Sequence, residues 1–135
     1  MATVKLIEYE EACADVRQIY DDIMHTKETD WINNFWKALA VQPDLLRRTW
    51  EGVKDVMTSG VLDPLTKEMI YIAVSTANGC TYCINSHTAA ARLKGMTDEM
   101  VSELMAIIGM ANQTNALANG LQIEVDSAFR AGGLK

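Results

Sequence analysis

The run of residues from Met69 to Val74 constrains the fold most, because its six side chains are all apolar or aromatic. Upstream, Asp63-Pro64 suits a helix cap followed by a first helical position, and Asn78-Gly79 suits a helix end. A helix over residues 64–78 would be apolar on nearly every side, so other helices or a second subunit must cover it. Near its start lies Glu68, a charge that is costly to bury unless it is paired.

Helical patterns also fill most of the rest of the 135-residue chain. Apolar spacing and helix punctuation predict further helices over about residues 10–24, 31–39, 43–57, 80–94, from 97 onward, and 112–129. No alternating run bounded by turn residues indicates a strand, and Thr3 to Ile7 is the sole short candidate. We therefore predict a single all-α domain spanning residues 1–135, a bundle of about six to seven helices.

The composition fits this fold and excludes several classes of partner. Hydrophobic residues make up 49% of the chain, enough to supply an oligomer interface as well as a core. A net charge of -6, with basic residues scattered, argues against binding to nucleic acid. No apolar run approaches the roughly 18 residues needed to cross a bilayer, and the amino terminus does not resemble an export signal. We expect a cytoplasmic protein that binds neither nucleic acid nor membrane.

Chemically active side chains gather within twenty residues. Cys80 lies twelve positions after Glu68, Cys83 completes a Cys-x-x-Cys pair, and His87 follows four positions later. If the chain is helical from Cys80 onward, both thiols and the imidazole fall within about 60° on one face. A tight reversal near Gly79 would place Glu68 and His87 at heights that differ by roughly 4.5 Å, which two side chains can span. The spacing thus predicts that Glu68 orients His87.

This arrangement favours thiol chemistry. The thiolate attacks peroxides and disulfides, whereas a cysteine with an ordinary pKa near 8.5 is mostly protonated at neutral pH. Two effects compete: the helix amino terminus favours ionisation of Cys80, and an imidazole backed by Glu68 favours that of Cys83. We expect Cys83 to attack first, because His87 can take its proton and return it to a leaving group. Cys80 then resolves the oxidised intermediate by forming a disulfide.

Structural interpretations of the same residues remain open. Two thiolates with His87 and Glu68 are four potential ligands of a zinc ion. His87 can instead be a hydrogen-bonded core histidine, and Glu68 an exposed residue of the first helical turn. Tyr82 fits a packing position at the rim of the site, where its hydroxyl can position a substrate. Cys13 is interpreted as a small buried hydrophobic side chain.

The spacing from Glu68 through Cys80-x-x-Cys83 to His87 resembles the signature of the alkylhydroperoxidase D-like proteins of the carboxymuconolactone decarboxylase superfamily. The similarity is densest from about residue 62 to residue 95. It implies an all-helical homo-oligomer, often a trimer or hexamer. In family members with peroxidase activity, the cysteine that matches Cys83 is oxidised by peroxide to a sulfenic acid, and the one that matches Cys80 closes the disulfide.

The same resemblance implies that Glu68 and His87 form a proton relay and that a lipoyl-bearing or thioredoxin-like donor reduces the disulfide. The family's signature commonly has a histidine where this chain has Tyr82, and a phenol is a poor proton shuttle at neutral pH. The decarboxylase branch does not rely on a cysteine pair, so retention of Cys80 and Cys83 argues against that activity.

The predicted function is a thiol-dependent, alkylhydroperoxidase-like antioxidant peroxidase that reduces hydroperoxides. Its redox group is the Cys80–Cys83 disulfide, and we expect no bound cofactor or metal. One alternative is a general disulfide oxidoreductase without efficient peroxide turnover. The other is a non-catalytic helical assembly protein whose cysteines are structural or bind a metal.

Overall fold

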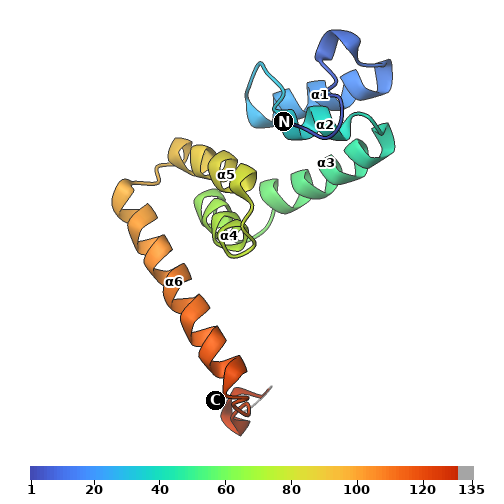
Figure 1. Cartoon of the computed structure of the whole chain (residues 1–135). Coiled ribbons are helices and arrows are strands. Elements are labelled where there is room, and N and C mark those ends of the chain that lie inside the picture. Colours follow the sequence, from blue (N-terminus) through green and yellow to red (C-terminus); the bar gives the residue numbers. More distant parts are fainter. Residues whose placement is uncertain (131–135) are drawn as a thin grey trace. The chain divides into compact units, whose positions relative to one another are not determined.

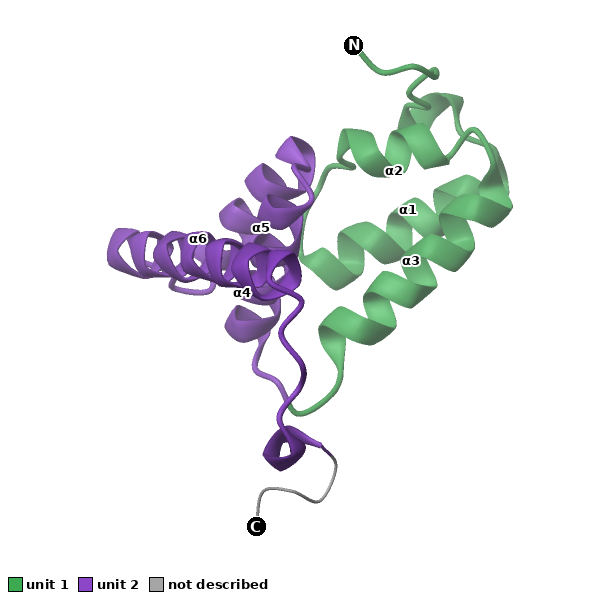
Figure 2. Cartoon of the chain, turned by 60° about the horizontal axis from the view of Figure 1, so that its bottom comes forward, with its two compact units in different colours: residues 1–61 green, residues 62–135 purple. Residues whose placement is uncertain are grey.

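The computed structural model describes residues 1–130, and its regular elements are all helical (Figure 1). Six α-helices and two short 3-10 turns occur in this range, with no strand among the described residues. The all-α prediction is therefore confirmed. The chain divides into two compact units, Met1–Val61 and Leu62–Lys135, each with its own apolar core (Figure 2). That residues 1–135 act as a single domain stays a prediction.

The first unit consists of three helices around one core. They are α1 (Ala14–Lys27), α2 (Asn34–Leu39) and α3 (Pro43–Thr58), preceded by the turn η1 (Tyr9–Glu11). Helix α3 packs against both α1 and α2. The buried members of the core are Ala12, Val16, Ile19, Tyr20, Ile23, Ile32, Trp36, Ala40, Leu46 and Trp50. None of the site residues predicted from the sequence lies in this unit.

Two predictions for this unit are corrected by the structure. The apolar spacing predicts a helix from Glu10, but residues 9–11 form a 3-10 turn and α1 begins only at Ala14. The second correction concerns Cys13, which is exposed rather than buried. Cys13 precedes the helix as the N-cap residue and has an extended backbone. The apolar spacing that would direct a helical residue at this position into the core therefore does not hold for it.

The second unit carries all the predicted site residues. Helices α4 (Pro64–Ala77) and α5 (Thr81–Leu93) pack against each other, and α6 (Asp98–Gly120) packs against α4 (Figure 1). A further turn, η2, spans Ser127–Phe129. The buried core residues are Ile72, Ala91, Met96, Leu104 and Ile108. The core thus involves only the first half of α6, and every residue from 109 to 130 is exposed.

Helix starts in this unit follow the sequence prediction. The carboxylate of Asp63 accepts a hydrogen bond of 3.0 Å from the backbone N–H of Thr66 at the start of α4. The hydroxyl of Thr97 accepts one of 3.2 Å from the N–H of Met100 at the start of α6. Each cap satisfies a backbone donor that the first helical turn leaves without a partner.

The turn between α4 and α5 depends on Gly79. Its φ is +68°, whereas Asn78 keeps a right-handed backbone with φ of -86°. The N–H of Cys80 donates to the carbonyl of Ser75 over 2.9 Å, which closes the end of α4. Glycine adopts this left-handed conformation without a steric penalty. The reversal returns the chain along α4 and sets the level at which the two helices face each other.

Helix α6 is longer than the sequence predicts. The pattern indicates one helix from Thr97 and another from Asn112 to Phe129, but a single helix runs from Asp98 to Gly120. The predicted end at Phe129 is wrong, because residues 127–129 form the separate 3-10 turn η2. The expected break fails because the stretch has no proline, and a glycine such as Gly109 costs an exposed helix only about 1 kcal/mol. Among residues 1–130, no helix combines the length and apolarity that crossing a membrane would require.

Replacing Gly79 with alanine tests the turn. We expect the free energy of unfolding to fall by about 1–2 kcal/mol, because a residue with a Cβ is strained at positive φ. An added Cβ would meet no atom within 4 Å, so a loss reports backbone strain and not a clash. Gly109→Ala is the matched control: its Cβ is equally free of contacts, and we expect a gain of about 0.5–1 kcal/mol. Urea unfolding measures both, and equal effects would contradict the role of Gly79.

Candidate active site

Glu68 and His87 form the centre of the candidate site. Glu68 lies in the second turn of α4 and is only 6% exposed, and His87 lies midway along α5. Glu68 Oε2 and His87 Nδ1 are 2.7 Å apart. The contact that the spacing predicts is therefore present, and the interpretation of Glu68 as an exposed residue is wrong. Because Nδ1 is engaged, Nε2 is the ring nitrogen left to accept a proton.

Two further residues contact this pair, and the sequence analysis did not single them out. Lys94, the C-cap residue of α5, places its Nζ 3.0 Å from Oε1 of Glu68. Tyr71 of α4 stacks on the imidazole of His87, with ring centroids 3.8 Å apart and planes inclined by 18°. The sequence spacing could have indicated both residues. Tyr71 follows Glu68 by three residues and Lys94 follows His87 by seven, so each pair shares a helix face.

The hydrogen bonds at Glu68 favour its ionised form. Burial raises the pKa of the carboxyl group, but hydrogen bonds from His87 and Lys94, together with the charge of Lys94, outweigh burial and leave the pKa below its ordinary value. Each carboxylate oxygen thus has its own partner, as a buried charge requires. Glu68 is therefore an anion at neutral pH.

The two thiols of α5 differ in their surroundings. Cys80 is the N-cap residue, and its sulfur accepts a hydrogen bond of 3.4 Å from the N–H of Cys83. Hydrogen bonds from the side chain and the N–H of Cys83 lower the pKa of Cys80. Burial, together with the hydrogen bond to Cys80 and the charge of Cys80, raises the pKa of Cys83 to about 11, although a hydrogen bond with Ser75 opposes the rise. In this dithiol the negative charge therefore forms first at Cys80.

Ser75 is a third residue that the sequence analysis missed. It is 5% exposed and follows Glu68 by seven residues, which puts it on the same side of α4. The site thus extends along α4 from the carboxylate to a hydroxyl that meets Cys83. On α5, His87 follows Cys83 by four residues, so the imidazole and this thiol share one face.

The remaining predicted residue, Tyr82, is 43% exposed in the first turn of α5, as a position at the rim requires. Within residues 1–130, no three His, Cys, Asp or Glu side chains are placed to hold a metal ion together. Glu68, one of the four potential zinc ligands weighed from the sequence, instead uses both oxygens on His87 and Lys94.

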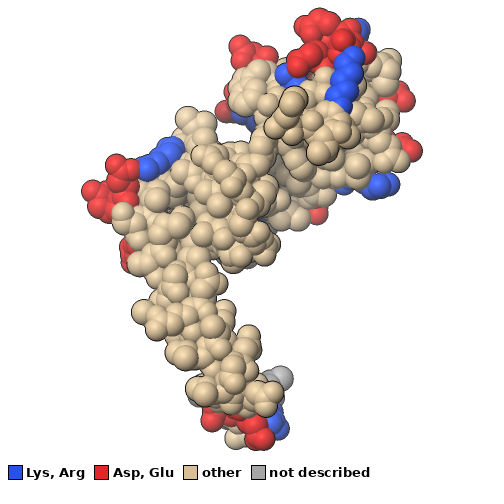
Figure 3. Space-filling view, in the orientation of Figure 1, with Lys and Arg blue, Asp and Glu red and all other residues tan. Residues whose placement is uncertain are grey.

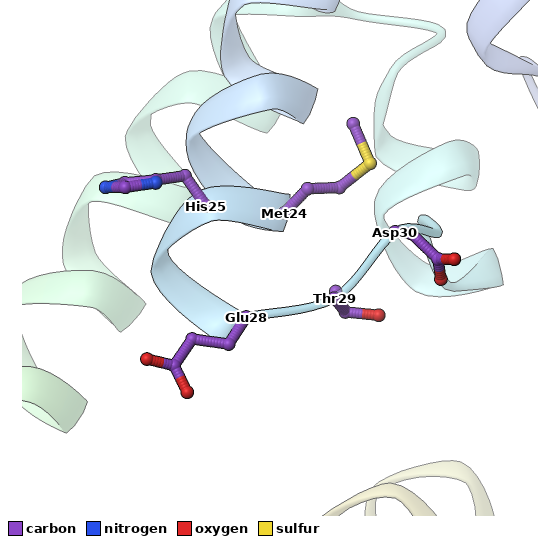
Figure 4. Close-up of a pocket in the computed structure, with 5 residues that line it drawn as sticks. All are labelled: Met24, His25, Glu28, Thr29 and Asp30. Carbon is purple, nitrogen blue, oxygen red and sulfur yellow. The ribbon is translucent and has the colours of Figure 1, made fainter.

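A surface hollow in the first unit contains none of these residues. It has a volume of about 580 Å³ and lies at the end of α1. The residues that line it are Met24, His25, Glu28, Thr29 and Asp30 (Figure 4). Figure 4 shows their side chains pointing in different directions, so the hollow offers no converging set of reactive groups.

Comparison with known proteins agrees with the geometry of the second unit. Residues 43–123 match the model of the carboxymuconolactone decarboxylase family. The crystal structure of the alkylhydroperoxidase AhpD core from Rhodospirillum rubrum is similar to this chain, with a TM-score of 0.92 and 57% sequence identity. That likeness covers 96% of this chain and 97% of the other.

Curated relatives are similar over shorter stretches. The alkyl hydroperoxide reductase AhpD of Solibacter usitatus is 39% identical over 64 residues, which is 47% of this chain and 34% of that protein. AhpD of Mycobacteroides abscessus is 44% identical over 52 residues, or 38% of this chain and 30% of that protein. Each match thus spans about a third of the curated relative's length. The family match and the nearly full-length likeness to an AhpD core establish that this chain is an AhpD-like member of the carboxymuconolactone decarboxylase family.

Proposed function

We propose that this protein is a thiol-dependent peroxidase that reduces hydroperoxides through a dithiol/disulfide cycle of Cys80 and Cys83. The observation that carries the proposal is the buried Glu68–His87 hydrogen bond, one helical turn from a Cys-x-x-Cys pair. Two thiols supply the two electrons that a peroxide needs, and an oriented imidazole moves the protons. The names of the two AhpD relatives support the same chemistry.

In the proposed cycle, His87 takes the proton of Cys83. The thiolate then attacks the terminal oxygen of the hydroperoxide, the one that carries hydrogen. The O–O bond breaks as an S–O bond forms, and the departing alkoxide takes the proton from His87 and leaves as an alcohol. The thiolate of Cys80 then attacks the sulfur of the sulfenic acid on Cys83, so that an S–S bond forms as the S–O bond breaks. The departing hydroxide takes up one proton from solvent, which balances the proton that Cys80 released on ionising, and leaves as water. A dithiol of the lipoyl or thioredoxin type reduces the resulting disulfide and becomes a disulfide itself.

The ionisation of the two thiols fits these roles. Because the pKa of Cys83 is about 11, this thiol needs a base before it can attack. The lowered pKa of Cys80 increases the share of this thiol that is ionised and can resolve the sulfenic acid. It also makes Cys80 the better leaving group when the disulfide is reduced, since a thiol of lower pKa departs faster.

A general disulfide oxidoreductase without efficient peroxide turnover is the second candidate, and Tyr82 favours it. This tyrosine lies at the exposed rim, at the position where the family's signature commonly has a histidine. Phenols in general shuttle protons poorly at neutral pH. In this alternative the cysteines exchange electrons with a second dithiol pair and not with a peroxide.

We also propose that copies of this chain assemble, as a trimer or hexamer, through α6. No charged residue occurs from Leu104 to Ile123, and Figure 3 shows α6 uncharged between the charged groups near its two ends. Met110 and Leu117 in the exposed half of the helix, together with the C-cap residue Leu121, lie within roughly 40° of one another on one face. An exposed apolar stripe of this kind is typical of a protein interface. The proposed location is the cytoplasm, where such thiols are kept reduced.

Cysteine variants test the order of attack. After one equivalent of an alkyl hydroperoxide, Cys80→Ser is expected to keep a sulfenic acid on Cys83, since no second thiol resolves it. Cys83→Ser is expected to lose at least about 100-fold in peroxide turnover. Mass spectrometry after trapping with dimedone locates the oxidised sulfur, and Cys13→Ser, which changes the cysteine of the first unit, should behave as wild type. Faster oxidation of Cys80 in the Cys83→Ser variant would reverse the two roles.

Alkylation tests the ionisation of the thiols. In the reduced protein at pH 7.5, iodoacetamide is expected to modify Cys80 before Cys83, because the thiolate is the reactive form. The lowered pKa of Cys80 keeps its thiolate present at a lower pH than in an unfolded chain, whereas the pKa of Cys83, about 11, leaves that sulfur protonated. In strong denaturant the two rates should become equal. Preferential labelling of Cys83 in the folded protein would contradict this assignment.

A charge on α6 tests the proposed assembly. Leu117 is 54% exposed, and Leu117→Arg is expected to reduce the oligomer to a smaller species in sedimentation velocity, because a buried unpaired charge opposes association. Asn115→Arg is the control, since the same charge then lies on the opposite face of α6. An unchanged sedimentation coefficient for Leu117→Arg would exclude this face as the interface.

A further inference from the structure

We propose that Lys94 is a positioning residue that keeps His87 neutral, and therefore able to accept a proton, by balancing the charge of the buried Glu68. The inference rests on the proposed function, because it assigns a role within the same site. Three side chains form a continuous series: Lys94 Nζ lies 3.0 Å from Oε1 of Glu68, and Oε2 lies 2.7 Å from Nδ1 of His87.

Glu68 is the group whose charge needs balancing. It is 6% exposed, and a carboxylate this deeply buried requires a counter-charge or protonation. Its oxygens contact two side chains, Lys94 and His87. Lysine is ordinarily a cation at neutral pH, whereas histidine changes its charge there. Without Lys94, an imidazolium at position 87 would be the remaining counter-charge in contact with the carboxylate.

The charge of His87 decides whether it can act as a base. An imidazolium carries protons on both nitrogens and cannot take one from Cys83. With Lys94 in place, the neutral imidazole can donate its Nδ1–H to Glu68 and keep a basic Nε2. Tyr71 holds the ring by stacking and adds no charge. Lys94 thus acts on the thiol chemistry through Glu68 and His87.

Other charged groups at this end of the second unit are differently engaged. They are Asp63 and Lys67 at the start of α4, Arg92 on α5, and Asp98 and Glu99 on α6, and Asp63 caps α4 by accepting from the N–H of Thr66. Arg92 pairs with Asp98 and also donates to a backbone carbonyl. Lys67 is turned about 100° from Glu68 around α4. Residues 69–91 contain no Asp, Glu, Lys or Arg, so the hairpin itself offers no substitute for Lys94.

A proton NMR titration of Lys94→Met tests the proposal. The chain has two histidines, His25 and His87, so the imidazole signals are few and His25 of the first unit serves as an internal reference. We expect the His87 signals to titrate at a pH about one unit higher in Lys94→Met than in the wild type, with His25 unchanged. In Lys94→Arg, the pH midpoint of the His87 titration is expected to equal that of the wild type, because arginine keeps the positive charge.

Arg92→Gln is the matched control. It removes a positive charge two residues from Lys94, but that charge pairs with Asp98 and not with Glu68. Its His87 titration should match the wild type. In peroxide assays, the acid limb of the pH–rate profile should move upward by the same single unit in Lys94→Met only.

An unmoved His87 midpoint in folded Lys94→Met, or an equal shift in Arg92→Gln, would overturn the proposal. Circular dichroism checks folding, and Lys94→Gln replaces the methionine variant if that variant does not fold. The NMR readout needs no turnover. A chain that shows the expected shift but reduces no peroxide would therefore refute the proposed function and leave the role of Lys94 intact.

Discussion

The buried charge of Glu68 is the constraint on which the second unit depends. A carboxylate at this depth is stable only with a partner for each oxygen, and both partners come from α5. The need for pairing therefore fixes the register of α4 against α5 as well as the tautomer of His87. Removing either partner would leave one oxygen of the buried carboxylate unpaired, so the stability of the hairpin and its proton chemistry depend on the same contacts.

Much of the fold and the centre of the site follow from the sequence. Helical spacing, the cap at Asp63 and the turn at Gly79 predict the hairpin, and counting residues from that turn brings Glu68 to His87. These features are local in the sequence. Predicting the contact between Glu68 and His87 requires only the rise per residue of an α-helix. The continuous α6 was missed because a glycine such as Gly109 lowers helix propensity without ending a helix, so the pattern alone does not show whether two predicted helices are joined.

Lys94, Tyr71 and Ser75 were missed for a different reason. Each lies on the correct helix face, three or seven residues from a recognised member of the site, but many residues meet that condition. Which of them reaches the site depends on the side chains that the facing helix presents. Cys13 is the opposite case: its residue type favours burial, but its place just before α1 leaves it exposed.

The sulfur of Cys80 caps α5 and, in the proposed cycle, also gives up electrons. As a thiolate it adds a full negative charge at the positive end of the helix dipole, where it strengthens the first turn. Once this sulfur is oxidised or alkylated, that charge is gone and the cap weakens. The first turn of the helix that bears His87 then loses this stabilisation, so the redox state of Cys80 and the stability of the start of α5 are linked.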